Sequence, residues 1–282
     1  MKIVSFLTLA AVAMLSSCGG QNKPAEVAEP VAEEEVKYDN METREVGNVS
    51  ITWIQDNKEA RKMAADLFET PEELVKELGA EEGFDASMST FLVEADGKKI
   101  LFDTGNGNED SQLLPSLEKL GVSPADIDVI AITHMHGDHI GGMMKGDEVV
   151  FPKAEVYMSQ LEHDANVNTP DDKNAQQKKV VAAYKDRLHL IQFGETIPGG
   201  FVALDCVGHT AGHTAFQNGE LLIIGDLMHG AALQVTHPEF CARFDQDKDN
   251  SIANRKKYLD LARQNHLLLA GMHLPGGFMT IE

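Results

Sequence analysis

Short apolar runs that each end near a glycine, histidine or aspartate recur along the chain from residue 129 onward. They cover residues 129–133, 201–207, 221–224 and 267–270. Runs of this length, rich in branched apolar residues and bounded by turn residues, predict buried strands. Polar residues that follow such strands are held on a rigid scaffold, so we expect a functional site at these strand ends.

The part of the chain before residue 129 adds further strands. Residues 49–54 predict one strand, and residues 90–93 and 99–102 predict two more. The last two flank Asp96-Gly97, a dipeptide that favours the tight turn of a hairpin. Several of the predicted strands would therefore be antiparallel neighbours.

Helical patterns lie between and after these strands. They cover residues 113–120, the exposed second half of 164–186, and residues 249–266. Another helix is predicted from Thr70, with Thr70 as the cap, Pro71 at the first helical position and Glu73 at the third. Strands mixed with helices predict an α/β domain.

The N-terminus has the features of an export signal. Lys2 precedes an apolar segment, residues 3–15, which is too short to span a bilayer as a mature helix. Leu15-Ser16-Ser17-Cys18-Gly19 resembles the lipobox of bacterial lipoproteins, in which the cysteine is lipidated; an ordinary signal peptide with a chance cysteine remains the alternative. We predict a signal peptide at 1–17, an acidic, lipidated flexible tether at 18–47, and one folded domain at 48–282.

Composition and charge narrow the possible partners. The formal net charge of −21 argues against nucleic acid, because binding to phosphate depends largely on lysine and arginine. The domain has two cysteines, Cys206 and Cys241, without CxxC spacing, so a thiolate metal site is not expected. We predict two buried thiols, although an exported compartment would permit a disulfide.

The densest chemistry is His134-Met135-His136-Gly137-Asp138-His139, directly after the first of the apolar runs. Imidazole and carboxylate groups suit a divalent ion such as zinc, and a run this dense can serve two metal centres. Further candidates at later strand ends are His213, Asp226 and His273. Together they supply five imidazoles and two carboxylates, which match two zinc ions, or other divalent ions, sharing one carboxylate and a solvent molecule.

These motifs resemble the metallo-β-lactamase superfamily: H-x-H-x-D-H, then G-H-T-x-G-H-T, a G-D pair after a strand, and a late histidine. The resemblance covers about residues 51–273 and implies an αββα sandwich, two mixed sheets flanked by helices. The resemblance assigns His134, His136 and His213 to a first metal. It assigns Asp138, His139 and His273 to a second metal, and Asp226 to a bridge between the two. It also implies that Asp103 orients a ligand histidine, with capping of its own turn as the alternative.

Differences within the superfamily narrow the activity. The family's true β-lactamases lack the bridging aspartate found here as Asp226, which disfavours β-lactam hydrolysis. Gly225-Asp226-Leu227-Met228-His229 and Phe244-Asp245-Gln246-Asp247 resemble the methyl parathion hydrolase branch, beside the N-acyl-homoserine lactonases. The resemblance leaves His209 as a structural residue, and His229 and His237 as either cleft residues or satisfied loop histidines.

We therefore expect a dinuclear zinc hydrolase that uses a metal-bridging hydroxide on small esters, lactones or organophosphate triesters. Asp226 would bridge the metals. Asp138 would be primarily a metal ligand, and its free oxygen could also pass a proton to the leaving group. The alternatives are an anchored metal-binding or sensing lipoprotein without turnover, or a metallo-β-lactamase. The expected setting is the bacterial cell envelope, with a membrane anchor on Cys18; a homodimer is left open.

Overall fold

The computed structural model describes residues 39–170 and 173–282, which belong to one compact unit, Lys37–Glu282. The predicted signal peptide, most of the predicted tether and Cys18 lie outside the described residues. Of the described helices, none is both long enough and apolar enough to cross a bilayer.

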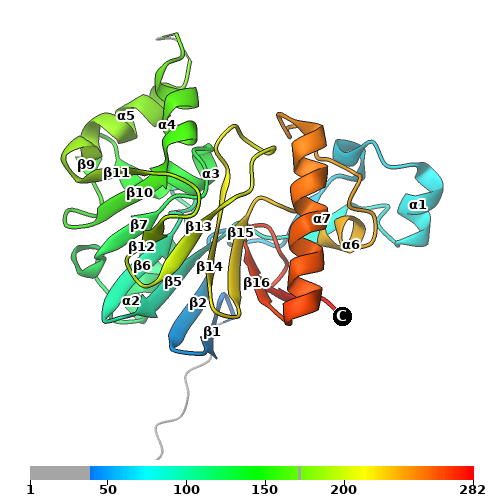
Figure 1. Cartoon of the computed structure of the whole chain (residues 1–282), viewed down its shortest axis with the longest axis horizontal. Helices are drawn as coiled ribbons and strands as arrows, with labels where there is room; N and C mark the ends of the chain where they lie inside the picture. The colour runs from blue at the N-terminus through cyan, green and yellow to red at the C-terminus, as the bar shows by residue number, and fades with distance from the viewer. Residues whose placement is uncertain (1–38, 171–172) are drawn as a thin grey trace, which may run out of the picture. The chain divides into compact units, whose positions relative to one another are not determined.

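Two mixed sheets form the centre of the fold (Figure 1). The first has the order β1 (Met41–Val46), β2 (Val49–Gln55), β5 (Ser89–Ala95), β6 (Lys98–Phe102), β7 (Val129–Ala131), β10 (Glu155–Ser159) and β11 (Leu188–Ile191). The second has the order β12 (Thr196–Ile197), β13 (Phe201–Asp205), β14 (Thr214–Asn218), β15 (Leu221–Gly225), β16 (Leu268–Gly271) and β17 (Phe278–Thr280). Strands β6, β7, β10 and β11 pair in parallel, as do β15 and β16, and the other pairs are antiparallel. Two small hairpins are added, β3 (Arg61–Met63) with β4 (Phe84–Ala86) and β8 (Met144–Lys145) with β9 (Glu148–Val149).

The helices are α1 (Glu72–Glu77), α2 (Leu113–Lys119), α3 (Gly137–Ile140), α4 (Gln160–Val167), α5 (Ala175–Tyr184), α6 (Ala231–Gln234) and α7 (Lys248–Asn265). Short 3-10 turns are η1 (Ala65–Phe68), η2 (Pro124–Asp126), η3 (Gly141–Met143) and η4 (Lys185–Arg187). The longest helix, α7, runs beside the strands of the second sheet, and α4 and α5 lie near β10 and β11 (Figure 1).

The main core lies between the two sheets. Phe102 of β6 contacts Phe201 and Phe216 of the second sheet, with ring centroids 4.8 and 5.4 Å apart. Outside the first sheet, Leu117 and Tyr184 bring α2 and α5 into a second apolar cluster; outside the second sheet, Tyr258 brings α7 into a third. Burial of apolar surface on both faces of each sheet accounts for four layers. The predicted αββα sandwich is confirmed.

Most predicted elements are present, and the differences at β1 and Thr70 have physical reasons. Residues 41–46, placed in the tether, form β1, which pairs along its length with β2. The folded unit therefore begins before residue 48: the polar composition of β1 reflects an edge strand whose side chains are largely exposed. Helix α4 was not predicted. Thr70 does not cap α1, because Pro71 holds the N-cap position and no side chain caps the helix.

The ends of β7, β15 and β16 and the loop from β13 to β14 meet at one edge of the sandwich. The backbone amide of Thr214, at the start of β14, donates to the carbonyl of Thr133 after β7 at 2.9 Å. This bond ties the loop after β7, in the first sheet, to the β13–β14 loop of the second. Cys206, at the start of the β13–β14 loop, and Cys241 are free and buried, as predicted.

Candidate metal centre

The first cluster of ligand atoms brings together three imidazoles and a carboxylate. The Nδ1 atom of His136 lies 3.0 Å from Nε2 of His134 and 3.0 Å from Nε2 of His209. Asp226 Oδ2 lies 3.7 and 3.4 Å from the same two Nε2 atoms. Ligand atoms about 2.0–2.1 Å from a tetrahedral zinc are separated by about 3.3 Å, so this spacing fits one metal ion.

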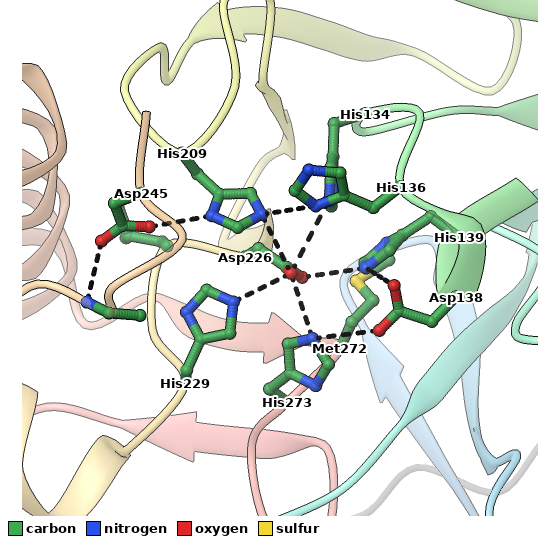
Figure 2. A network of polar contacts seen from close by, with 12 residues as sticks. His134, His136, Asp138, His139, His209, Asp226, His229, Asp245, Met272 and His273 are labelled. Carbon is green, nitrogen blue, oxygen red and sulfur yellow. Dashed lines mark hydrogen bonds and ion pairs between the residues drawn. The ribbon is translucent and has the colours of Figure 1, made fainter. Parts of the chain in front are cut away.

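The second cluster shares Asp226 with the first. Its Oδ1 lies 3.2 Å from His139 Nε2, and its Oδ2 lies 3.0 Å from His273 Nε2. Asp138 faces the same two histidines, 3.8 Å from His139 and 3.6 Å from His273. Figure 2 shows Asp226 at the centre of the ring of histidines, between the two clusters.

Hydrogen bonds on the outer side of the imidazoles fix which nitrogen faces inward. Asp103 accepts from Nδ1 of His139 at 2.7 Å and from the Thr133 hydroxyl at 2.6 Å. The Thr133 oxygen in turn lies 3.1 Å from Nδ1 of His134. Nδ1 of His273 donates to the backbone carbonyl of Ser87 at 2.8 Å. These bonds leave the Nε2 lone pairs of the three histidines directed at the cluster.

Asp103 itself is in a strained conformation. Its φ angle is 59°, in the left-handed region that residues other than glycine seldom adopt, and its side chain is fully buried. Strain of this kind persists where surrounding contacts over-determine it, as at functional sites. The structure thus places Asp103 beside a ligand histidine, in the arrangement that the resemblance implied.

His213 is not placed where the resemblance put it. Its Nδ1 donates to the carbonyl of Cys206 at 2.9 Å, and its Nε2 accepts from the backbone amide of Asp226 at 3.0 Å. Both ring nitrogens are therefore used, and among the described residues His213 joins none of the candidate metal groups. His209, predicted to be structural, takes that place, because its Nε2 faces His136 and Asp226. The histidine that faces the cluster stands four positions earlier in the same G-H-T-A-G-H-T loop.

Two carboxylates that support the site were not predicted from the sequence. Asp245 accepts from Nδ1 of His209 at 2.8 Å. Glu162, in α4, accepts from the backbone amides of Met135 and Gly212 at 2.9 and 3.0 Å, and so holds both ligand loops. Asp245 stands in the segment that carried the family resemblance, which was a signal for its importance; Glu162 stands in a polar helix and gave none.

The electrostatics of the cluster favour a bound cation. Burial lowers the pKa of His134 well below its ordinary value, and lowers that of His209 to about 4, so both are neutral ligands near pH 7. Burial would also lower the pKa of His139, but the carboxylates of Asp226 and Asp103 outweigh it and raise the pKa well above the ordinary value. Burial would raise the pKa of Asp226, yet the surrounding imidazoles hold it well below its usual range. The buried carboxylates therefore require compensating positive charge, which the proton on His139 supplies without a metal and which a bound cation would replace.

Unpartnered buried atoms test whether a metal would fit. Nε2 of His139 and Oδ1 of Asp226 are buried and have no hydrogen-bond partner among the described residues. They face each other at 3.2 Å, between oriented imidazoles and the carboxylate of Asp138. Leaving such atoms unsatisfied is costly, and coordination to a divalent ion would satisfy them. The donor set fits two metal ions, one held by His134, His136 and His209, the other by Asp138, His139 and His273, with Asp226 between them.

A cavity of about 260 Å³ opens over these groups. Its wall includes the side chains of Arg61, Met63, Leu67 and Phe244. His229 also lines it, with Nε2 3.0 Å from Asp226 Oδ2, whereas His237 is partly exposed beside Glu239. Apart from Arg61, this wall is apolar, and the candidate metal ligands form the other side of the cavity.

Known proteins share this sequence pattern and fold. Residues 85–263 match the Metallo-beta-lactamase superfamily. The solved structure of hydrolase AbOPH in the beta lactamase superfamily is 28% identical, with a TM-score of 0.75, over 87% of this chain and 94% of that one. AidC, a dizinc quorum-quenching lactonase solved with a homoserine product, is 25% identical, with a TM-score of 0.77, over 86% of this chain and 93% of that one.

A curated relative, hydroxyacylglutathione hydrolase of Serratia proteamaculans (strain 568), is 29% identical over 140 residues, 48% of this chain and 44% of that protein. The match spans less than half the length of each of the first curated relatives. The family match covers more than half of this chain, the structural matches cover nearly all of the described fold, and the site carries the motif residues. The chain belongs to the metallo-β-lactamase superfamily.

Proposed function

We propose that the protein is a dinuclear zinc hydrolase that acts on small carboxylic esters or lactones, with organophosphate triesters as secondary substrates. The observation that carries the proposal is the shared carboxylate of Asp226, with oriented imidazoles on both sides and an apolar-walled cavity above. The similarity to AidC, a dizinc lactonase, supports the lactone class. Two metals would supply an activated water near neutral pH and polarise the substrate carbonyl.

The chain's own residues perform the remaining tasks. Met63, Leu67 and Phe244 form an apolar wall, which would bind the alkyl or acyl part of a substrate and exclude water from the reacting bond. Asp226 and the imidazoles hold the reacting centre at the floor of the cavity.

In the proposed reaction, Asp138 would move the proton. Its carboxylate is 29% exposed and lines the cavity, unlike the fully buried Asp103. Burial would raise its pKa, but His139 and His273 lower it, so the group is an ionised base at neutral pH. It would take the proton of the attacking water and deliver it to the leaving alkoxide oxygen as the ester bond breaks.

The test is a substrate panel with the purified protein and a metal analysis of the same sample. We expect about two zinc ions per chain and turnover of lactones and aryl esters that a chelator abolishes and added zinc restores. Asp138→Asn should lower kcat more than it lowers metal content. Two tightly bound metals with no turnover across lactones, esters, thioesters and phosphotriesters would favour a binding or sensing protein. Turnover confined to β-lactams would favour the β-lactamase alternative.

We also propose that the protein is exported and lipid-anchored through Cys18 to a bacterial cell envelope. The support is the lipobox-like sequence before Gly19 and the short apolar segment that precedes it. Mass spectrometry of the mature N-terminus from the bacterial host should find a diacylated cysteine. Cys18→Ser should release the protein from the membrane fraction, and a soluble wild-type protein with a cleaved, unmodified N-terminus would contradict the anchor.

A further inference from the structure

Asp245 lies on the outer side of the first ligand cluster and contacts the metal-facing histidine of the β13–β14 loop. Its side chain is fully buried, and Oδ1 lies 2.8 Å from Nδ1 of His209. The other oxygen, Oδ2, accepts from the backbone amide of Ala242 at 3.1 Å. Figure 2 shows the order Asp245, His209, Asp226 across the site.

A buried arginine of α7 holds this carboxylate in place. Nη2 of Arg255 lies 3.4 Å from Asp245 Oδ2, and the Arg255 side chain is 1% exposed. Its other N–H groups bind backbone carbonyls, Nε that of Leu227 at 2.9 Å and Nη1 that of Pro238 at 2.7 Å. Leu227 directly follows the bridging Asp226, so one guanidinium fixes both the partner of His209 and the segment that carries Asp226.

We propose that Asp245, held by Arg255, is a positioning residue that fixes the tautomer and ring orientation of His209 for binding the first metal. The inference rests on the proposed dinuclear centre. A carboxylate on Nδ1 keeps the proton there and leaves the Nε2 lone pair for the metal, and it makes the imidazole a stronger ligand.

The distances favour this role over simple neutralisation of Arg255. The Asp245 carboxylate is closer to His209, at 2.8 Å, than to Arg255, at 3.4 Å. Three of the arginine's hydrogen bonds go to backbone carbonyls, so most of its N–H groups have acceptors other than Asp245. The arrangement directs the carboxylate at the imidazole, and the arginine keeps it there.

The histidines of the two metal sites have different hydrogen-bond partners on their outer sides, so the role of Asp245 can be tested separately at one site. The second-metal ligands have separate supports, Asp103 for His139 and the carbonyl of Ser87 for His273. Asp245 contacts neither of these histidines. Its loss should therefore weaken one metal site and leave the other.

The experiment is cobalt titration of the metal-depleted full-length protein, followed by its visible absorption and by competition with a chelator. For Asp245→Ala we expect one cobalt equivalent to bind about 10–100-fold more weakly, with a changed spectrum, and the second to be unchanged. Asp245→Asn keeps an acceptor oxygen for Nδ1 and should show a smaller loss at the same site. If the alanine variant does not fold, the asparagine variant decides.

The matched control is Asp247→Ala. Asp247 lies two residues further on, and its carboxylate accepts from the amide of Asn250 as the N-cap of α7. We expect this variant to lower the melting temperature while both cobalt equivalents keep their affinity and spectrum. If the Asp245 variants behave in the same way, Asp245 is a structural residue and the inference is overturned. A wild-type protein that binds fewer than two cobalt ions would instead contradict the proposed dinuclear centre.

Discussion

Two histidines of one loop, His209 and His213, have the same local sequence and opposite roles. Each stands in a Gly-His-Thr triplet, and each is buried. His209 gives Nδ1 to Asp245 and turns Nε2 toward His136 and Asp226. His213 uses both nitrogens on backbone groups, the carbonyl of Cys206 and the amide of Asp226. A ligand is distinguished by the nitrogen that its surroundings leave free, and the triplet itself does not encode that.

The two roles depend on each other. Because His213 accepts from the amide of Asp226, it fixes the backbone that carries the shared carboxylate. The preceding Gly225 has a φ angle of 51°, and a Cβ there would lie 2.4 Å from the His213 ring nitrogen. The structural histidine and the glycine together set the position of Asp226, while His209 contacts the same residue from the cavity side.

The largest expected effect that separates the two comes from His209→Ala. It removes an imidazole from the first cluster, so the protein should lose about one metal equivalent and roughly a thousandfold in kcat/KM, more than the 10–100-fold typical of losing an outer partner. Metal analysis and ester or lactone turnover measure both quantities. Two retained metals with normal turnover would reverse the assignment and return His213 to the ligand set.

The counterpart, His213→Ala, should act mainly on stability. It leaves the amide of Asp226 and the carbonyl of Cys206 without their partners and opens a cavity in a fully buried position. We expect a loss of about 2–4 kcal/mol in the free energy of unfolding, measured by urea denaturation. The folded variant should still bind two metals. Loss of one metal with an unchanged free energy of unfolding would contradict the structural role of His213.

The part of the site that could be predicted is the part in which ligands are adjacent in sequence or directly follow apolar strands. His134, His136, Asp138 and His139 lie within six positions, and Asp226 and His273 follow β15 and β16. Similar apolar runs predicted β2, β5, β6 and β7 of the first sheet and β13, β15 and β16 of the second. These signals are local, so a single sequence carries them.

The rest depends on contacts between distant residues. Asp245 is 36 positions from His209, and Glu162 is 50 positions from Gly212. No local pattern shows that these pairs are in contact. Nor does one show that the backbone amide of Asp226 donates a hydrogen bond to Nε2 of His213. Strand β1 was missed for a related reason: it is an edge strand stabilised by pairing with β2, and its own residues are mostly polar.

Glu162→Gln tests whether the loop of His209 and His213 depends on the first ligand loop. The carboxylate accepts from the amides of Met135 and Gly212, one on each oxygen. A glutamine has one acceptor oxygen, so one of these amides would face an NH2 group. We expect about 2 kcal/mol of lost stability and two metals still bound. Asp164→Asn, on the exposed side of the same helix, is the control. Equal losses of stability for both variants would show that the two hydrogen bonds accepted by Glu162 contribute nothing.

The last prediction concerns how His213 responds to acid. Burial lowers its pKa to about 3 in the folded protein, well below the ordinary value of 6.5. The unfolded chain therefore takes up the proton first as the pH falls. The stabilisation from neutral His213 is complete above about pH 6.5 and is lost progressively toward pH 3, at about 1.4 kcal/mol per pH unit.

His213→Asn should remove this contribution. Its free energy of unfolding should fall less steeply between pH 6 and pH 4 than that of the wild type, by a slope of about one proton. Metal binding is itself linked to protons, so both proteins are measured with a chelator present. His209 is also buried, and its pKa is lowered to about 4, but it has a carboxylate partner in Asp245, whereas His213 has two backbone partners. Equal slopes in the wild type and His213→Asn would mean that His213 is not held neutral by its two backbone partners, and the distinction between the two histidines would then rest on metal content alone.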